Sequence, residues 1–161
     1  MTALKIAAPL ATIVLMATPA FALDVAKETE VNATPDKVWS TVGDFCAIAD
    51  WHPAVASCEE SDADGATQRT LSLEGGGSIL EELIARDDEA MSYTYRILES
   101  PLPVANYEST ISVLGEGEMS TLSWSGTFDA AEGATDEDAT GAIGGIYDAG
   151  LASIAEKAAA M

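Results

Sequence analysis

A series of strand-like segments that ends in one long helix is the feature of this sequence that most constrains its fold. Between Val55 and Phe128, apolar and polar residues alternate in short segments separated by turns such as Ser61–Gly65 and Gly75–Gly77. Alternation with a period of two places successive side chains on opposite faces of a sheet, and short turns favour antiparallel pairing. Residues 143–155 then carry apolar side chains at helical spacing. Because an antiparallel sheet with one apolar face must be covered, we expect this helix to pack across it.

Six of the expected strands follow one another as hairpins, and a first strand precedes them. The clearest alternation lies in residues 121–128, where Leu122, Trp124 and Phe128 alternate with polar residues. The glycine turn at 75–77 allows a tight reversal, because glycine reaches positive φ without steric cost. The expected strands are residues 23–32, 55–60, 67–74, 79–86, 91–98, 107–114 and 121–128.

Two short helices are expected between the first strand and the hairpins. Thr34-Pro35-Asp36 combines an N-cap residue, a proline at the first helical position and an acid in the first turn, which is typical of a helix start. This helix is expected to end near Gly43. A second is expected at Phe45–Asp50, before Trp51-His52-Pro53 interrupts it.

Glycines complicate the prediction of the C-terminal helix. Gly141, Gly144, Gly145 and Gly150 each cost roughly 1 kcal/mol relative to alanine inside a helix. Either the helix begins late, near Ile143 or beyond, or small residues bring it close to the sheet or widen a cavity. The glycines do not match GxGxxG after a strand, so nucleotide binding is not expected.

Residues 1–22 have the composition of an export signal. Lys5 is their one charged residue, an apolar run through Ile13–Met16 follows, and Ala20-Phe21-Ala22 supplies the small residues that signal peptidase reads. The run is too short for a comfortable membrane span of about 20 apolar residues. We therefore expect a signal peptide at 1–22, cleaved after Ala22, and one periplasmic or secreted domain at 23–161 without stable membrane insertion. A retained N-terminal anchor is the alternative.

The charge of the chain excludes some binding partners. It has 27 acidic residues against 7 basic ones, a formal net charge of −20. Nucleic acids select clustered lysine and arginine, and an anionic membrane surface would repel this chain. Hydrophobic residues make up 48% of the sequence, which argues against a disordered acidic tail. Solubility, a saline habitat or a basic periplasmic partner remain as reasons for the acidity.

The two cysteines have two interpretations. Export to an oxidising compartment favours a disulfide between Cys46 and Cys58, which the chain-entropy model values at about 3 kcal/mol. The alternative is two buried thiols. A metal site is not expected, because two cysteines and one histidine do not supply a conventional closed zinc site.

Motifs along residues 23–161 follow the pattern of one superfamily. They are Ala33–Trp39, Gly43-Asp44-Phe45, Asp50–Pro53, Cys58-Glu59, Tyr93–Ile97, Ser100–Pro103 and Trp124–Phe128. Together they resemble the SRPBCC or START-like superfamily, in particular its bacterial polyketide cyclase/dehydrase-like branch. The resemblance implies an α+β helix-grip fold, in which a curved antiparallel sheet of about seven strands wraps a long C-terminal helix. Members bind lipids, hormones, polyketides and other apolar ligands, and some are enzymes, so the fold alone does not choose a function.

His52 is a candidate for acid–base chemistry. It is the only histidine, and the pKa of a free imidazole lies near neutrality. Its place between Trp51 and Pro53 favours a structural imidazole that bonds to the backbone. A Ser/His/Asp arrangement is not indicated, because the chain has one histidine and no nucleophile-elbow motif, and Cys46 and Cys58 are expected to be paired rather than nucleophilic.

Arg69 and Glu81 are the other two catalytic candidates. Glu81 and Glu82 are neighbours in an expected strand, so one carboxylate faces inward, where a raised pKa would suit a general base. On so acidic a protein, a solvated strand face is the favoured interpretation. Arg69 and Arg96 either point inward, which suits an anionic head group, or outward, where they relieve repulsion.

Aromatic residues are the main indication of a ligand pocket. Buried tyrosines offer apolar area together with a hydroxyl that needs a partner, although ordinary core packing explains at least half of them. The expected ligand-binding residues are Trp51, Leu73, Met91, Tyr93, Tyr95, Tyr107, Trp124, Tyr147 and Leu151. By resemblance, the entrance is expected near Gly75–Gly77 and the loop Ser100–Asn106.

Three functions are compatible with these features. The first is a non-catalytic periplasmic protein that binds a small apolar ligand, without a cofactor, between the sheet and the C-terminal helix. The second is a cyclase- or dehydratase-like enzyme, which requires an inward-facing pair of ionisable residues. The third is an accessory protein for a basic periplasmic partner, because opposite charge steers association.

Overall fold

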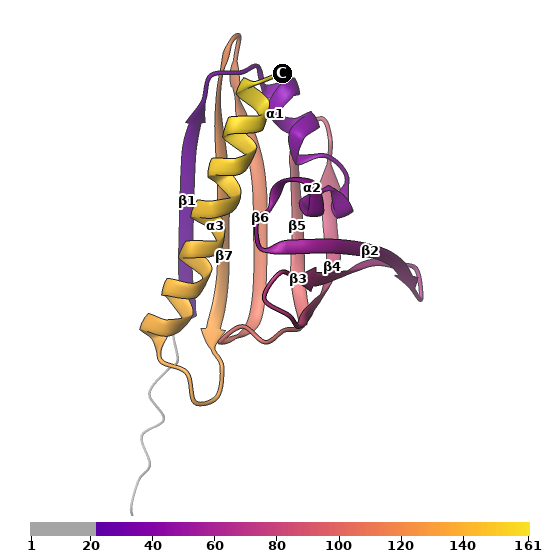
Figure 1. Ribbon diagram of the computed structural model, residues 1–161, viewed down its shortest axis with the longest axis vertical. Helices are drawn as coiled ribbons and strands as arrows, with labels where there is room; N and C mark the ends of the chain where they lie inside the picture. Colours follow the sequence, from indigo (N-terminus) through magenta and orange to yellow (C-terminus); the bar gives the residue numbers. More distant parts are fainter. Residues whose placement is uncertain (1–21) are drawn as a thin grey trace, which may run out of the picture.

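A seven-stranded antiparallel sheet carries one long helix across one face (Figure 1). The computed structural model describes residues 22–161, so the expected signal peptide lies almost entirely outside the described residues. The strand order is β1-β7-β6-β5-β4-β3-β2. The strands are β1 (Leu23–Val31), β2 (Val55–Ala63), β3 (Ala66–Leu73), β4 (Ser78–Asp87), β5 (Ser92–Glu99), β6 (Val104–Glu116) and β7 (Met119–Ala130). The helices are α1 (Pro35–Val42), the 3₁₀ turn η1 (Phe45–Ala47), α2 (Ile48–Trp51) and α3 (Asp136–Ala159). This is the expected α+β helix-grip fold.

The short helices begin and end close to where the sequence places them. The Thr34 hydroxyl accepts a hydrogen bond from the Lys37 amide at 3.4 Å, and Pro35 opens α1. Gly43 ends it at φ 66°, a conformation that favours glycine. The helix expected at Phe45–Asp50 is in fact the η1 turn followed by α2, and Asp44, which precedes η1, provides no side-chain cap.

Two hairpins extend further than their turn signals suggest. β2 pairs with β3 as far as Ala63, so the turn at Ser61–Gly65 is confined to Asp64 and Gly65, both at positive φ. β6 continues to Glu116 in the same way. Register shifts interrupt β2 and β4, and such bulges strengthen strand twist. Figure 1 shows β2 and β3 crossing at a steep angle to the long strands, which curves the sheet.

The C-terminal helix begins at Asp136, well before Ile143, so the late-start interpretation is wrong. Thr135 caps the helix by accepting a hydrogen bond from the Asp138 amide at 3.1 Å. Gly141 and Gly145 lie on its exposed side. Gly150 is buried, and a Cβ there would stand 2.6 Å from Trp124 and 3.0 Å from His52. Absence of a side chain at this position therefore lets α3 approach the sheet closely.

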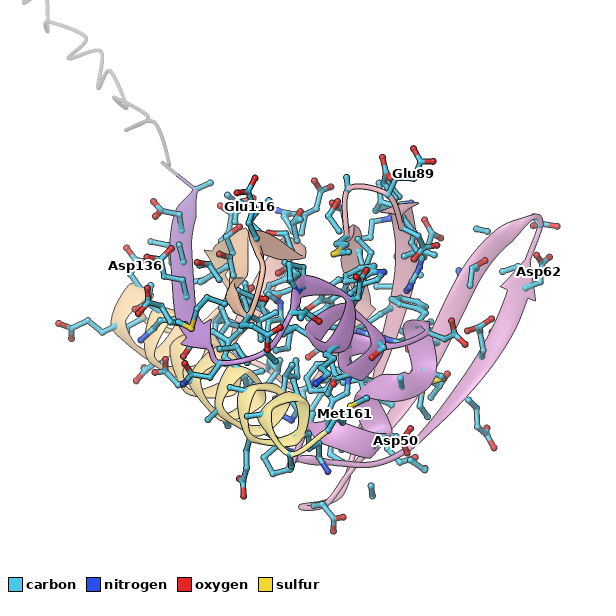
Figure 2. All side chains as sticks on the ribbon, turned by 90° about the horizontal axis from the view of Figure 1, so that it is seen from above. Asp50, Asp62, Glu89, Glu116, Asp136 and Met161 are labelled. Carbon is cyan, nitrogen blue, oxygen red and sulfur yellow. A yellow bond between two sulfur atoms is a disulfide. The ribbon has the colours of Figure 1, made fainter. Side chains whose placement is uncertain are left out.

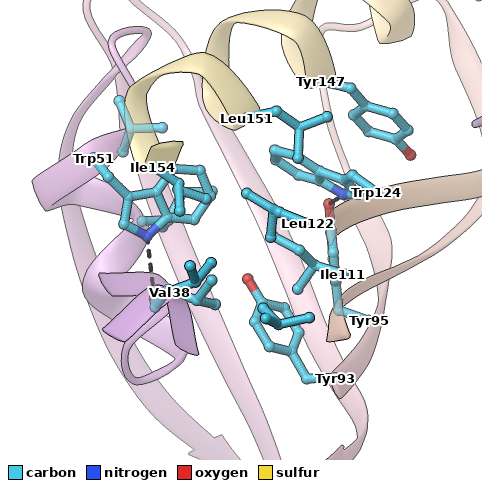
Figure 3. Close-up of a cluster of buried hydrophobic side chains, with 14 of the residues drawn as sticks. Val38, Trp51, Tyr93, Tyr95, Ile111, Leu122, Trp124, Tyr147, Leu151 and Ile154 are labelled. Atoms are coloured by element: carbon cyan, nitrogen blue, oxygen red, sulfur yellow. Dashed lines mark hydrogen bonds between the residues drawn. The ribbon is translucent and has the colours of Figure 1, made fainter. Parts of the chain in front are cut away.

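The core fills the space between α3 and the concave face of the sheet (Figure 3). The Trp124 and Tyr147 rings stack with centroids 4.6 Å apart and planes 13° apart. Trp51 packs edge-on against Trp124, and its indole N–H donates to the Val42 carbonyl at 3.1 Å. These contacts join the last strand, the last helix and the two short helices into one core.

Acidic side chains surround this core (Figure 2). Asp50, Asp62, Glu89, Glu116 and Asp136 are exposed at different ends of the molecule. Within residues 22–161, no helix is both long and apolar enough to cross a bilayer.

Candidate functional site

A cavity of about 200 Å³ lies between the curved sheet, α2 and α3. Trp124, Ile143 and Ile146 form its wall on the β7–α3 side, and Leu71 and Ile79 belong to the curved strands β3 and β4. Its lining residues are Ile48, His52, Ala54, Val55, Leu71, Leu73, Ile79, Glu81, Tyr95, Ile97, Leu102, Tyr107, Trp124, Ile143 and Ile146. A dry cavity of about 150 Å³ holds benzene. The space therefore suits a single ring or a short chain.

Glu81 forms the acidic part of the cavity wall and is bonded to Arg69 behind it. The two residues are Cα partners in the β3–β4 ladder. The Arg69 Nε donates to Glu81 Oε2 at 2.5 Å, and its Nη1 donates to the Phe45 carbonyl. Arg69 is fully buried, with its guanidinium carbon 3.9 Å from the Phe45 ring centroid and 5.1 Å from that of Tyr95. Among the described residues, its Nη2 has no hydrogen-bond partner.

Arg69 and Glu81 each stabilise the charged form of the other. Burial works against the charge of Arg69, but the adjacent Glu81 carboxylate keeps the pKa of the guanidinium above its usual range. Burial raises the pKa of Glu81, and Arg69 opposes that rise by charge attraction and hydrogen bonding. The ionic form of the pair is favoured, because a neutral Glu81 would leave the guanidinium buried without a counter-charge.

A chain of hydrogen bonds connects the aromatic hydroxyls beside the cavity. The Trp124 indole N–H donates to the Tyr95 hydroxyl at 3.1 Å, and Tyr95 bonds to the Tyr107 hydroxyl at 3.2 Å. Tyr107 bonds to the Tyr147 hydroxyl at 2.6 Å, which bonds to Ser109 Oγ at 2.8 Å. Burial raises the pKa of Tyr147 to about 12 and those of Tyr95 and Tyr107 well above their usual value. All three tyrosines are therefore protonated at neutral pH.

His52 uses both ring nitrogens to hold backbone groups. Its Nδ1 accepts from the Ala54 amide at 3.2 Å, and its Nε2 lies 3.1 Å from the Ile146 carbonyl of α3. A carbonyl only accepts, so Nε2 carries the proton and the ring is neutral. Burial lowers the pKa of His52, against the opposing effect of the Ile146 carbonyl. This is the backbone-bonded imidazole that the sequence favours.

Comparison with known proteins places this chain in a family. A family model described as polyketide cyclase / dehydrase and lipid transport matches residues 22–159. The chain belongs to this polyketide cyclase/dehydrase family. The family suggests a fold that binds hydrophobic ligands, in agreement with a largely apolar cavity between sheet and helix. A search of curated proteins found no significant match.

Solved structures of similar proteins share the architecture. The protein XoxI from Bacillus cereus is 35% identical with a TM-score of 0.75; the match covers 83% of this chain and 93% of that one. An uncharacterized protein from Bacillus thuringiensis is 33% identical with a TM-score of 0.76, covering 83% and 97%. The Zhui aromatase/cyclase from Streptomyces sp. R1128 is 18% identical with a TM-score of 0.69, covering 86% and 94%. The last likeness concerns the fold alone.

In this member of the polyketide cyclase/dehydrase family, six predicted site residues line the cavity: His52, Leu73, Glu81, Tyr95, Tyr107 and Trp124. Arg69 stands behind Glu81. Five expected ligand-binding residues lie outside the lining: Trp51, Met91, Tyr93, Tyr147 and Leu151. Four of these five are buried in the core, and Met91 is in a turn at φ 48° instead of in a strand.

The interpretation of Glu81 as part of a solvated strand face is wrong. Glu81 is 4% exposed, whereas Glu82 is the carboxylate that turns to the other face and bonds to Arg96. The reason is the ion pair with Arg69, which removes the main cost of burying the carboxylate. Arg96 is exposed, so neither arginine presents a free guanidinium to a ligand in the cavity.

Several aliphatic lining residues were not among the residues predicted from the sequence. Leu71, Ile79 and Ile97 line the cavity from neighbouring strands. Leu71 shares strand parity with Leu73, and Ile97 shares it with Tyr95, so alternation alone carries a signal for both. Ile48, Leu102 and Ile146 belong to α2, a loop and α3, and no local pattern points them to one place.

The disulfide between Cys46 and Cys58 is present, with the Cα atoms 5.5 Å apart. It joins η1 to β2, next to the Phe45 carbonyl that receives Arg69. Across residues 22–161, no group of three or more histidine, cysteine, aspartate or glutamate side chains is arranged to hold a metal ion.

Proposed function

We propose that this protein is an exported, non-catalytic binding protein for a small, mainly apolar ligand. The observation that carries the proposal is the cavity of about 200 Å³, whose lining is mostly aliphatic and aromatic. Apolar pockets with a few convergent polar groups are the usual form of small-molecule sites. The family to which the chain belongs supports the same class of ligand.

The entrance that we propose lies between two neighbouring loops. A Cβ on Gly77 would stand 3.7 Å from Pro101 Cγ, so the Gly75–Gly77 turn touches the loop, which is confined to Ser100–Pro103 because β6 begins at Val104. Leu102 of that loop lines the cavity. A surface hollow of about 770 Å³, lined by Ser100 and Asn106 among others, shares Ile97 and Tyr107 with the cavity. A ligand crossing this hollow would reach the cavity past Leu102.

Export is supported by two features of the described residues. Cys46 and Cys58 form a disulfide, which persists in oxidising compartments. The first strand begins at Leu23, directly after the proposed cleavage site. Intact-mass measurement of protein from the periplasmic fraction should give a chain that starts at Leu23. A mature chain that retains residues 1–22 would contradict cleavage after Ala22.

Ligand binding is tested by filling the cavity. We expect toluene to bind the wild-type protein in calorimetric titration, and the variant Leu73→Trp to abolish binding because Leu73 lines the cavity. Leu114→Trp is the matched control, since Leu114 is 65% exposed and lies outside the linings of both the cavity and the hollow. Loss of toluene binding in both variants, or in neither, would overturn the assignment of the cavity as the binding site. Failure of all small apolar probes to bind the wild-type protein would overturn the proposed function.

An enzyme of the cyclase or dehydratase kind is the second candidate. It is favoured by one observation: an inward-facing ionisable pair, Arg69 and Glu81, borders the cavity. Both groups are bonded to each other, and both nitrogens of His52 are occupied, so no free base–acid pair faces the ligand. Mass spectrometry of a bound ligand before and after incubation distinguishes the two functions, because a binding protein returns it unchanged.

A basic periplasmic partner is the third candidate, and the net charge of −20 supports it. Exposed acids on the β2–β3 hairpin, Glu59, Glu60, Asp62 and Asp64, provide a surface for such a partner. Capture of a basic protein at low salt and its release at high salt would support this role. No capture at low salt would leave it without support.

A further inference from the structure

We propose that the ligand carries an uncharged hydroxyl group that donates a hydrogen bond to Glu81, because the cavity offers hydrogen-bond acceptors and no free side-chain donor. This inference rests on the proposed function, since it concerns the ligand of the same cavity. It specifies the ligand chemistry as an apolar phenol or alcohol.

The direction of the hydroxyl chain follows from its two ends. The Trp124 indole N–H only donates, and the Ser125 carbonyl, which receives Ser109 Oγ at 2.8 Å, only accepts. Ser109 has one hydroxyl proton and gives it to Ser125, so Tyr147 must donate to Ser109. By the same count, Tyr107 donates to Tyr147 and Tyr95 donates to Tyr107. Each hydroxyl proton is therefore already used inside the protein.

The other polar side chains of the lining have no free hydrogen either. The Trp124 N–H is given to Tyr95, and the His52 Nε2–H is given to the Ile146 carbonyl. The unpartnered Nη2 of Arg69 belongs to a residue outside the lining. A ligand carbonyl or carboxylate would thus lose its hydrogen bonds to water on entering the cavity and find no side-chain donor there. This loss weakens binding.

Glu81 is the acceptor in this wall. One of its oxygens, Oε2, receives Arg69, and the described residues provide no hydrogen bond to Oε1. A ligand hydroxyl would supply that missing bond. Since Arg69 already balances the carboxylate charge, a cationic ligand would add an uncompensated charge to the buried site. An uncharged donor satisfies both conditions.

Toluene and phenol provide a matched test, because a methyl group replaces a hydroxyl. In calorimetric titrations of the wild-type protein, we expect phenol to bind at least as tightly as toluene, and benzaldehyde and benzoate to bind about 10-fold more weakly than phenol or worse. Tighter binding of benzaldehyde or benzoate than of phenol would overturn the inference. This comparison needs no variant.

The double variant R69M/E81L tests the role of Glu81 directly. It replaces the buried pair with apolar side chains of similar size, an exchange that buried ion pairs often tolerate. The affinity ratio of phenol to toluene should fall about 10-fold or more, because a bond to a charged acceptor is lost. An unchanged ratio with toluene still bound would overturn the hydroxyl inference alone. Failure of toluene and phenol to bind the wild type would overturn the proposed function and this inference with it.

Discussion

Arg69 and Glu81 face each other across neighbouring strands, with the guanidinium Nε 2.5 Å from a carboxylate oxygen and both side chains almost completely buried. Glu81 lines the cavity, and Arg69 lies outside the lining and bonds to Glu81. Arg69 also donates a hydrogen bond to the Phe45 carbonyl, so it anchors the η1 turn, which the disulfide joins to β2. The same ion pair therefore stabilises the η1 turn and positions the Glu81 carboxylate in the cavity wall.

Removing one partner of this pair should be more damaging than removing both. Glu81→Ala leaves the Arg69 charge buried without a counter-ion, and we expect a loss of about 3–5 kcal/mol in the free energy of unfolding. R69M/E81L should recover most of that loss. Urea unfolding of wild type, E81L, R69M and R69M/E81L gives the coupling energy from a closed double-mutant cycle, and E81A measures the cost of truncating the acid. Additive effects of the two single changes would show that the pair does not act as a unit.

The sequence contained signals for the burial of Arg69 and Glu81, but the high acidity favoured a solvated face for Glu81 and the direction of Arg69 was left open. Arg69 alternates in step with Leu71 and Leu73, and Glu81 does so with Ile79 and Leu83. Strand parity therefore places both on the apolar face. Strand parity does not predict how β3 and β4 align. The observed register of the two strands is what brings Arg69 opposite Glu81.

Other parts of the structure differed in how much local sequence specifies them. The cap at Thr34 and the end of α1 at Gly43 were predictable, because both depend on residues adjacent in the chain. The hydroxyl chain was not, since Tyr95, Tyr107 and Tyr147 meet only after two strands and α3 have packed. Lining residues on loops are beyond prediction for the same reason.

Gly150→Ala should destabilise the protein although alanine favours helices. The new Cβ would stand 2.6 Å from Trp124, and this ring is held in its stack on Tyr147. Overpacking of this kind costs about 1–3 kcal/mol. Gly145→Ala is the matched control, because no atom outside the local backbone of α3 lies within 4 Å of the place that its new Cβ would take, and it should stabilise α3 by up to about 1 kcal/mol. Thermal unfolding that shifts both variants in the same direction would contradict the close approach of α3.

Reduction of the disulfide should lower stability without preventing folding. Cys46 and Cys58 are separated by 12 positions, and the chain-entropy model gives about 3 kcal/mol for a loop of this size. Urea unfolding with and without reductant measures the difference. The double variant C46A/C58A is the control and should not respond to reductant. Equal midpoints for the oxidised and reduced wild type would contradict a stabilising role.

His52 should make stability depend on pH on the acidic side of neutrality. Its pKa is lowered from 6.5 by burial, so below about pH 6.5 the unfolded chain takes up a proton that the folded chain resists. The contribution of neutral His52 to the free energy of unfolding is fully present above about pH 6.5 and is lost as the pH falls toward the lowered pKa of the folded state. His52→Gln keeps a donor for Ile146 but does not titrate. The stability difference between wild type and H52Q should shrink as the pH falls from 7.5 to 5, and a constant difference would contradict the buried neutral imidazole.

Tyr107→Phe should give the cavity a hydrogen-bond donor that the wild type lacks. Tyr95 donates its proton to Tyr107 in the directed chain, and removing the acceptor frees that proton beside the cavity. A ligand with an acceptor then gains a bond, so benzaldehyde should bind about 2- to 10-fold more tightly to Y107F than to the wild type. Toluene is the control, since it has no acceptor and its affinity should change little. An equal gain for toluene would indicate that the extra space, and not the released proton, causes the effect, and the direction assigned to the hydroxyl chain would then be wrong.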